Sequence, residues 1–289
     1  MITLRHALRD YLGMRRALGY KLYRDGIALE HFISFLEERK QDYITVAYAL
    51  EWAQQPSSAQ PATWAGRLKY VRGFAQYLSA ADSRTEIPSS TLLPHKAKRA
   101  RPYIYSEAEI CSLLAAALEL PTDHAIKKQT YYCLLGLLAV TGMRISEALD
   151  LKIANVDFFS GMLTIEDSKL GKSRLIPLHA STEAVLAKYV RCREEFLDGQ
   201  QSTYFFVNMV GNRLDEGTVR RTFYFLSRMI GIRQADASRG PRLHDFRHGF
   251  AVNTLLQWYR DGVDVESRLP ALATFLGHVH VSDTYWYLT

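Results

Sequence analysis

The C-terminal part of this 289-residue chain carries side chains that could attack a phosphodiester bond. His244 and Arg247 form a His-x-x-Arg pattern, His278 follows further along, and Tyr285 and Tyr287 come next. A tyrosine hydroxyl has an ordinary pKa of about 10, so a tyrosine nucleophile needs a cationic field and a proton acceptor. Residues at i and i+3 in the first turn of a helix can face one point. We therefore expect His244 to act as an acid or base beside Arg247.

Two further cations lie upstream of these residues. Arg144 stands in the run TGMRISEAL, and Lys169 stands in the run SKLGKSRLIPL. Phosphoryl transfer builds negative charge on the nonbridging oxygens, which planar arginine side chains match bidentately, whereas a lysine is a point charge suited to proton transfer. We therefore expect Arg144 and Arg247 to clamp a phosphate without a metal ion, and Lys169 to protonate the leaving 5′ oxygen.

In the order Arg, Lys, His-x-x-Arg, His and Tyr, these residues resemble the active-site series of the tyrosine recombinases, also called phage-type integrases, and above all their Xer-like branch. The motif resemblance covers residues 103–289. Each pattern alone is common, since His-x-x-Arg often marks only an exposed helix face. The resemblance implies that His278 contacts the scissile phosphate and that Glu147 supports the site.

The choice between the two C-terminal tyrosines follows from the same resemblance. Residues two apart on a helix diverge by roughly 200°, so Tyr285 and Tyr287 cannot both line one pocket. The family spacing from His278 selects Tyr287, nine residues on, as the nucleophile. Tyr285 is the second candidate, and its alternative role is aromatic packing.

The resemblance implies a site-specific DNA recombinase that cleaves and rejoins strands through a 3′-phosphotyrosyl intermediate, in integration, excision or resolution. It implies a helical, SAM-like core-binding domain followed by an α+β catalytic domain. It also implies a homotetramer on double-stranded DNA, with one dimer per site, in a prokaryotic cytoplasm at the nucleoid. Two alternatives stay open, namely a type IB topoisomerase that relaxes DNA and a non-cleaving DNA-binding regulator with the same fold.

Composition narrows the class of protein further. The cysteines are scattered and form no C-x-x-C pair, and the histidines lack metal-ligand spacing, so we expect no metal site and a reducing compartment. No G-x-x-x-x-G-K-[ST] run is present, so we expect no nucleotide cofactor. The longest apolar run is too short for a membrane span, and no signal peptide is apparent. We therefore predict an enzyme that needs no cofactor and no membrane.

Charge and proline patterns predict three segments. Residues 1–102 hold 16 Lys and Arg against 9 Asp and Glu, a net charge of +7, and the remainder holds 20 against 21, a net charge of −1. A basic part joined to a near-neutral part is typical of a DNA clamp attached to a catalytic domain. We predict a helical DNA-binding domain at 1–87, a basic linker at 88–102 and a catalytic domain at 103–289. The predicted DNA-contacting residues are Lys96, Lys98, Arg99, Arg101, Lys172 and Arg174.

The fold class expected from these patterns is mainly α with a small β-sheet or hairpin. Ser106 and Glu109 have the spacing of a capping box that starts a helix, and an apolar segment from Tyr131 to Val140 predicts a buried helix ending at Thr141-Gly142. Runs at 162–166 and 174–178 predict a hairpin, and 203–207 a further strand. Apolar spacing predicts additional helices at 183–195, 218–230, 246–258 and 269–276.

The chain stops at Thr289, two residues after the presumed nucleophile. Many members of the resembled family continue with a tail that docks onto a neighbouring protomer. Either this sequence is truncated at its C-terminus or its assembly uses other contacts, and we favour truncation.

Overall fold

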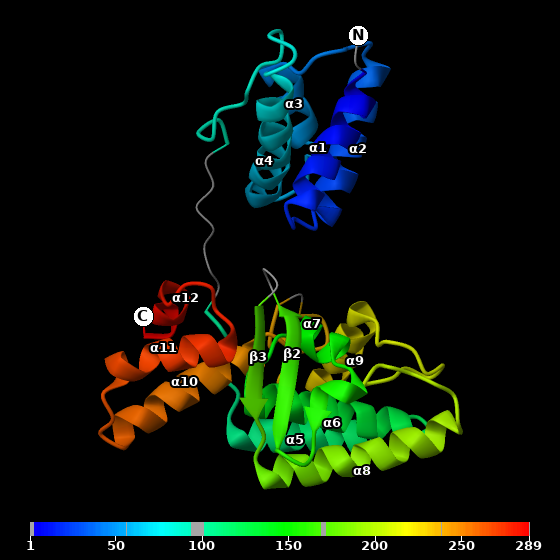
Figure 1. Cartoon of the computed structure of the whole chain (residues 1–289), viewed down its shortest axis with the longest axis vertical. Helices are drawn as coiled ribbons and strands as arrows, with labels where there is room; N and C mark the ends of the chain where they lie inside the picture. Colours follow the sequence, from blue (N-terminus) through cyan, green and yellow to red (C-terminus); the bar gives the residue numbers. More distant parts are fainter. Residues whose placement is uncertain (1–2, 56, 94–100, 169–171, 238, 289) are drawn as a thin grey trace. The chain divides into compact units, whose positions relative to one another are not determined.

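A computed structural model describes residues 3–55, 57–93, 101–168, 172–237 and 239–288, and the chain divides into two compact units, Met1–Ala100 and Arg101–Thr289 (Figure 1). The described part of the first unit is helical. Its helices are α1 (Leu4–Ala17), α2 (Tyr23–Glu38), α3 (Val46–Ala53) and α4 (Pro61–Leu78).

Local capping explains where the helices of the first unit begin. The Thr3 side chain accepts the backbone N–H of His6 before α1, and Thr45 does the same for Tyr48 before α3. The α4 helix starts with Pro61, at a position where the missing N–H of proline costs little. The core of this unit consists of the inward faces of the four helices, with Phe32 and Phe74 fully buried.

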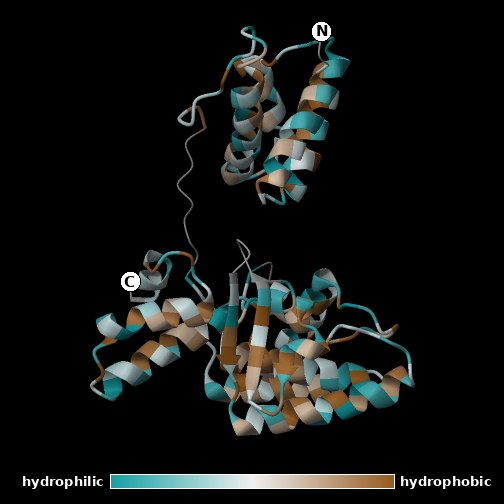
Figure 2. Ribbon diagram, in the orientation of Figure 1, coloured by the Kyte–Doolittle hydropathy of each residue, from teal (hydrophilic) through white to brown (hydrophobic). Residues whose placement is uncertain are grey.

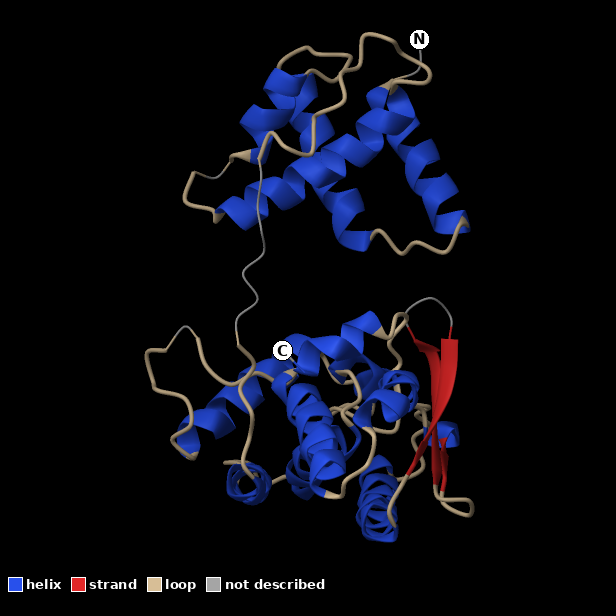
Figure 3. Cartoon of the chain, turned by 90° about the vertical axis from the view of Figure 1, so that its left-hand side faces the viewer, coloured by secondary structure: helices blue, strands red, loops and turns tan. Residues whose placement is uncertain are grey.

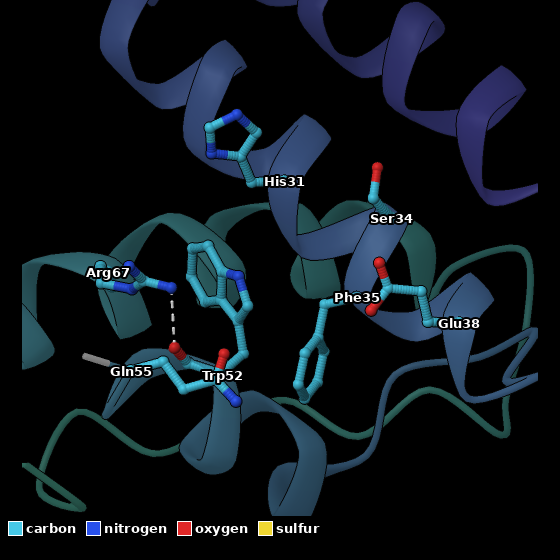
Figure 4. A pocket seen from close by; sticks show the side chains of 7 residues that line it. All are labelled: His31, Ser34, Phe35, Glu38, Trp52, Gln55 and Arg67. Atoms are coloured by element: carbon cyan, nitrogen blue, oxygen red, sulfur yellow. Dashed lines mark hydrogen bonds between the residues drawn. The ribbon is translucent and has the colours of Figure 1, made fainter. Parts of the chain in front are cut away.

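A pocket of about 410 Å³ opens on the first unit between α2, α3 and α4 (Figure 4). The guanidinium of Arg67 lies 3.9 Å from the centroid of the Trp52 ring and donates a hydrogen bond of 2.8 Å to the Trp52 carbonyl. This contact joins the end of α3 to α4. The Trp52 ring that lines the pocket is therefore covered by the guanidinium of Arg67.

The second unit combines helices with a small antiparallel sheet, so the predicted fold class, mainly α with a small sheet, is confirmed. In Figure 3 the strands lie along one side of the helices. In chain order, the elements are α5 (Glu107–Leu118), α6 (Ala125–Thr141), α7 (Ile145–Asp150), η1 (Ile153–Asn155), β1 (Val156–Asp157), β2 (Met162–Ser168), β3 (Lys172–Pro177), α8 (Ala180–Leu197), α9 (Glu216–Met229), α10 (Asp245–Arg260), α11 (Val265–Leu276), α12 (Ser282–Tyr285) and η2 (Trp286–Leu288).

Most sequence-predicted elements of the second unit are present. The capping box of Ser106 and Glu109 starts α5, and the buried α6 ends before Gly142, as the patterns predict. Most helices carry both apolar and polar residues (Figure 2), so that an apolar face can pack against the core while a polar face meets solvent. The part of the chain that the structure describes contains no helix long and apolar enough to cross a bilayer.

The sheet has the order β1-β2-β3, and Leu163 faces Ile176 across the β2–β3 pair. Both residues are fully buried, so the pair closes the sheet over the helices. The predicted strand at 203–207 is wrong, because this segment makes only isolated bridges. Phe205 and Phe206 are both buried, and consecutive burial is incompatible with the alternating faces of a half-buried strand.

Candidate active site

Two glycines end helices at the places where site residues must leave the helix axis. Gly142 ends α6 with φ +59°, and Gly277 ends α11 with φ +68°. A Cβ at Gly142 would lie 2.7 Å from the Phe250 ring, and a Cβ at Gly277 would lie 2.8 Å from Nη1 of Arg174. Both positions therefore require glycine, because the backbone has a positive φ and a Cβ atom would clash with a neighbouring side chain.

The two predicted clamp arginines donate hydrogen bonds to backbone carbonyls at these helix ends. Arg247 on α10 donates 3.0 Å from Nη1 to the Gly142 carbonyl and 2.7 Å from Nη2 to the Leu276 carbonyl. Arg144, two residues after Gly142, donates 3.0 Å from Nη2 to the Gly277 carbonyl. Each guanidinium is therefore held in place: the ends of α6 and α11 both supply acceptors to Arg247, and the end of α11 supplies one to Arg144.

Glu147 on α7 connects Arg144 to β3. Its carboxylate accepts the Arg144 backbone N–H at 2.8 Å and Nη1 of Arg144 at 2.7 Å. The same carboxylate accepts Nη2 of Arg174 at 2.7 Å and Nη1 at 3.1 Å. Burial alone would raise the pKa of Glu147, but the hydrogen bonds and charges of Arg174 and Arg144 hold it below its usual value. Glu147 is therefore an anion that orients two cations.

The C-terminal end of the unit brings His278 and Tyr287 together. Helices α10, α11 and α12 pack at this end (Figure 1). The rings of His278 and Tyr287 are nearly parallel, at 16°, with centroids 6.0 Å apart. Nδ1 of His278 lies 2.7 Å from the hydroxyl of Thr284, which is fully buried. Tyr285, by contrast, is 48% exposed.

Histidines of α10 complete this ring cluster. His248 meets Tyr287 edge-on, with centroids 5.5 Å apart, and meets His244 edge-on at 4.9 Å. His244 is exposed as a residue and precedes the first helical residue, Asp245. His248 therefore lies between the predicted acid or base and the predicted nucleophile.

The site is an electropositive and partly dehydrated environment. Arg247 is only 2% exposed, and burial together with the charge of Arg144 lowers its pKa to about 10. Burial and the nearby Arg247 and Arg144 lower the pKa of His278 to about 4. Although the residue as a whole is exposed, partial burial of its imidazole together with His248 and Arg247 lowers the pKa of His244 as well. At neutral pH the arginines are charged and these two histidines are neutral, and a bound anion would satisfy the excess positive charge.

The structure brings five of the predicted site residues together through hydrogen bonds, one ring contact and electrostatic interactions, and His244 joins them through His248. These five are Arg144, Glu147, Arg247, His278 and Tyr287. Lys169, Lys96, Lys98 and Arg99 lie outside the described residues, as does the side chain of Lys172. Arg101 is exposed.

Arg174 requires a correction. It was predicted to contact DNA from the hairpin, but its side chain is only 7% exposed and faces Glu147 inside the protein. Alternation along β3 explains this, because Arg174 points to the opposite face from its exposed neighbour Leu175.

Sequence reasoning missed His248 and Thr284. The signal for His248 was present, since it lies four residues after His244 and therefore on the same helix face. Thr284 could not have been identified from the sequence, because a threonine before an aromatic run can serve many structural roles. Among the described residues, no three His, Cys, Asp or Glu side chains are grouped in a way that could hold a metal ion.

Comparisons with known proteins agree with this geometry. The sequence profile described as the Phage integrase family matches residues 105–289. A protein of Sinorhizobium fredii named as an integrase/recombinase is 54% identical, over 100% of this chain and 93% of its own length.

Two solved structures share the fold. One is the XerH site-specific recombinase bound to a palindromic difH substrate, with a TM-score of 0.66, 19% identity and coverage of 91% of this chain and 74% of that chain. The other is a lambda integrase tetramer bound to a Holliday junction, with a TM-score of 0.61, 18% identity and coverage of 98% and 79%. The match to the family profile, the close relative and the shared fold together show that this chain belongs to the phage integrase family, the tyrosine recombinases.

Proposed function

We propose that this protein is a site-specific DNA recombinase that cuts and rejoins DNA strands through a tyrosine-linked intermediate. In the reaction, the Tyr287 hydroxyl oxygen bonds to the scissile phosphorus and the bond to the 5′ oxygen breaks. The products are a 3′-phosphotyrosyl ester and a strand with a free 5′ hydroxyl. A 5′ hydroxyl from a partner duplex then attacks the ester, restores a phosphodiester and releases the tyrosine.

The observation that carries the proposal is that the ends of α6 and α11 anchor Arg247 and that the end of α11 anchors Arg144, beside the stacked pair of His278 and Tyr287. Anchored guanidiniums need little reorganisation when a phosphate acquires negative charge. Their remaining N–H groups are the donors for the nonbridging oxygens. Glu147 balances one positive charge and keeps Arg144 in place.

The neutral histidines suit proton handling. When Nδ1 of His278 accepts the Thr284 hydroxyl, Nε2 carries the hydrogen and can donate to a phosphate oxygen. The lowered pKa of His244 leaves its ring unprotonated at neutral pH, and we assign it the role of accepting the proton of the attacking tyrosine. We assign protonation of the leaving 5′ oxygen to Lys169, which directly follows β2 in the chain.

We further propose that the substrate is double-stranded DNA and that the working assembly is a homotetramer, with one dimer on each site. The support is the lambda integrase tetramer bound to a Holliday junction, which shares this fold. The net charge of +7 on residues 1–102 supports phosphate contacts by the first unit and the linker cations Lys96, Lys98, Arg99 and Arg101. We place the reaction in the prokaryotic cytoplasm, at the nucleoid.

Covalent trapping on nicked suicide duplexes tests the proposal. The duplexes carry candidate sites from DNA that flanks the gene, and wild type, Tyr287→Phe and Tyr285→Phe are compared as a matched pair of tyrosine variants. We expect a covalent protein–DNA band that only Tyr287→Phe abolishes. Loss of the band only in Tyr285→Phe would reassign the nucleophile.

The same preparation separates the two alternatives, which the comparisons do not favour. A topoisomerase of type IB would relax supercoiled DNA without exchanging strands between two sites. A non-cleaving regulator would shift the duplex in a native gel but form no covalent band. We expect exchange of strands between two site-bearing duplexes, which neither alternative produces.

A further inference from the structure

The side chain of Arg174 on β3 is buried and makes its hydrogen bonds within the protein, and the proposed cleavage reaction assigns it no role. Its side chain is 7% exposed, and all three of its donor nitrogens are used inside the protein. Two donate to the carboxylate of Glu147, and Nε donates 2.8 Å to the Phe275 carbonyl in the last turn of α11. The side chain therefore joins β3, α7 and α11, three elements that are distant in sequence.

Each of these contacts connects Arg174 to a residue of the candidate site. One connects it to Arg144 and the other to the segment that carries His278. Through Glu147, Arg174 reaches Arg144, whose backbone N–H and Nη1 bind the same carboxylate. Through Phe275, it holds the helix end that continues into Gly277 and His278. Nη1 of Arg174 also occupies the space that a side chain at position 277 would need. Arg174 thus packs against the turn whose carbonyl accepts Arg144.

A buried ion pair of this kind is poorly explained by stability. Removing two charges from water costs several kcal/mol, and well-packed apolar residues often replace such pairs without loss. What an apolar residue could not provide is the planar, bidentate support of a carboxylate whose other contacts hold Arg144. The chemistry of the arrangement therefore favours a role in orienting charge.

We propose that Arg174 is a positioning residue for phosphate activation, acting through Glu147 on Arg144 and through the end of α11 on the His278 turn. It touches no substrate. The proposal rests on the proposed function, because it concerns the rate of the tyrosine-dependent cleavage.

A double-mutant cycle tests this role. Single-turnover cleavage of the suicide duplex is measured for wild type, Arg174→Lys, Arg144→Lys and the double variant, with DNA affinity measured over a range of salt concentrations. Lysine keeps the charge but loses the bidentate geometry. We expect Arg174→Lys to slow cleavage on the order of 10²-fold, the cost of a small displacement of a reacting group. In the Arg144→Lys background it should add only a few-fold.

A matched control separates positioning from folding. Arg193 on α8 is also a buried arginine, 2% exposed, whose guanidinium donates to the carbonyls of Ser202 and Tyr204. Arg193→Lys should lower the melting temperature without changing the cleavage rate at a temperature where the protein is folded. If Arg174→Lys does not fold, Glu147→Gln, which keeps the shape of the acceptor, takes its place in the cycle.

Three outcomes would overturn the proposal. The effects of the two substitutions could multiply, so that Arg174 acts independently of Arg144. The rate could stay unchanged in folded Arg174→Lys, which would leave a structural role. DNA affinity and its salt dependence could fall, which would restore a DNA contact. Failure of the proposed function would give a different result. The wild type would form no covalent protein–DNA band, or Tyr287→Phe would still form it.

Discussion

The two units of this protein differ in that the second buries an ion pair in addition to the pairs at its surface. In the first unit the arginine pairs lie at the surface, as with Arg5 and Glu37, which are 2.6 Å apart with side chains 48% and 45% exposed. In the second unit the pair of Arg174 and Glu147 is nearly as short, 2.7 Å, but only 7% of each side chain is exposed. Distance alone does not separate these pairs.

Burial decides what each kind of pair can do. Surface charges are screened by water and salt and contribute little to stability, but together they attract phosphate at long range. Buried charges are costly unless the fold supplies partners, and those partners fix their orientation. In the proposed function, the first unit would therefore depend on its number of positive charges, whereas the second would depend on the exact positions of a few charged atoms.

The sharpest test of this contrast is Arg247→Ala. It removes a charge from the proposed phosphate site and leaves the carbonyls of Gly142 and Leu276 without their donor. We expect cleavage to fall roughly 10³-fold and the free energy of unfolding to fall by about 3 kcal/mol. Single-turnover trapping and urea unfolding measure the two effects. Arg221→Ala, at an exposed position of α9, is the control and should change neither.

Gly277→Ala tests whether the helix ends position the buried charges. The added methyl group meets Arg174 at 2.8 Å and the backbone must keep φ +68°. We expect a loss of about 3 kcal/mol in the free energy of unfolding and cleavage slower by roughly 10²-fold.

Gly262→Ala is the matched control for that variant, because Gly262 has φ +69° but nothing within 4 Å of its Cβ. It should cost only about 1 kcal/mol and leave cleavage unchanged. Equal effects of the two variants would show that backbone strain, and not the contact with Arg174, accounts for the loss.

The pH dependence of stability tests whether burial and the nearby arginines lower the pKa of His278. Its pKa is lowered in the fold from 6.5 to about 4, so the unfolded chain binds more protons in this window. Stability from this group is complete above pH 6.5 and is lost as pH falls towards 4. We expect His278→Gln to remove part of the slope of the urea midpoint between pH 7 and 5, where Glu147 does not yet titrate, and His244, whose pKa is also lowered, to account for the rest.

The comparison for that measurement is His280→Gln, an exposed position two residues away. Its urea midpoints should follow those of the wild type across the same pH range. A wild-type slope that survives in full in His278→Gln would assign the pH dependence to another histidine.

The smallest effect is expected at the surface pair of the first unit. Arg5→Ala removes the 2.6 Å contact with Glu37, yet water and salt already screen these exposed charges. We expect no measurable shift in the urea midpoint and an unchanged cleavage rate at low salt. A loss of stability like that of Arg247→Ala would contradict the distinction between the two units.

The sequence predicted the local features of the second unit well. A capping box needs only Ser106 and Glu109, and a glycine after an apolar helix needs only the residue at 142, so both can be recognised from neighbouring letters. The hairpin of β2 and β3 follows likewise from two short runs. The segment at 203–207 misled the same reasoning, because its aromatic residues are buried on consecutive positions by packing from elsewhere in the chain.

The kinds of groups needed for phosphodiester chemistry could be read from the order of the chain, since arginine, histidine and tyrosine carry their chemistry with them. Their arrangement could not. Arg144 and Gly277 are 133 positions apart, and Arg174 and Phe275 are 101 apart, so no local pattern reports their hydrogen bonds. Whether an arginine faces solvent or a buried carboxylate depends on which elements pack against it. That is why Arg174, one of several cations along the hairpin, was placed correctly only once β3, α7 and α11 were seen together.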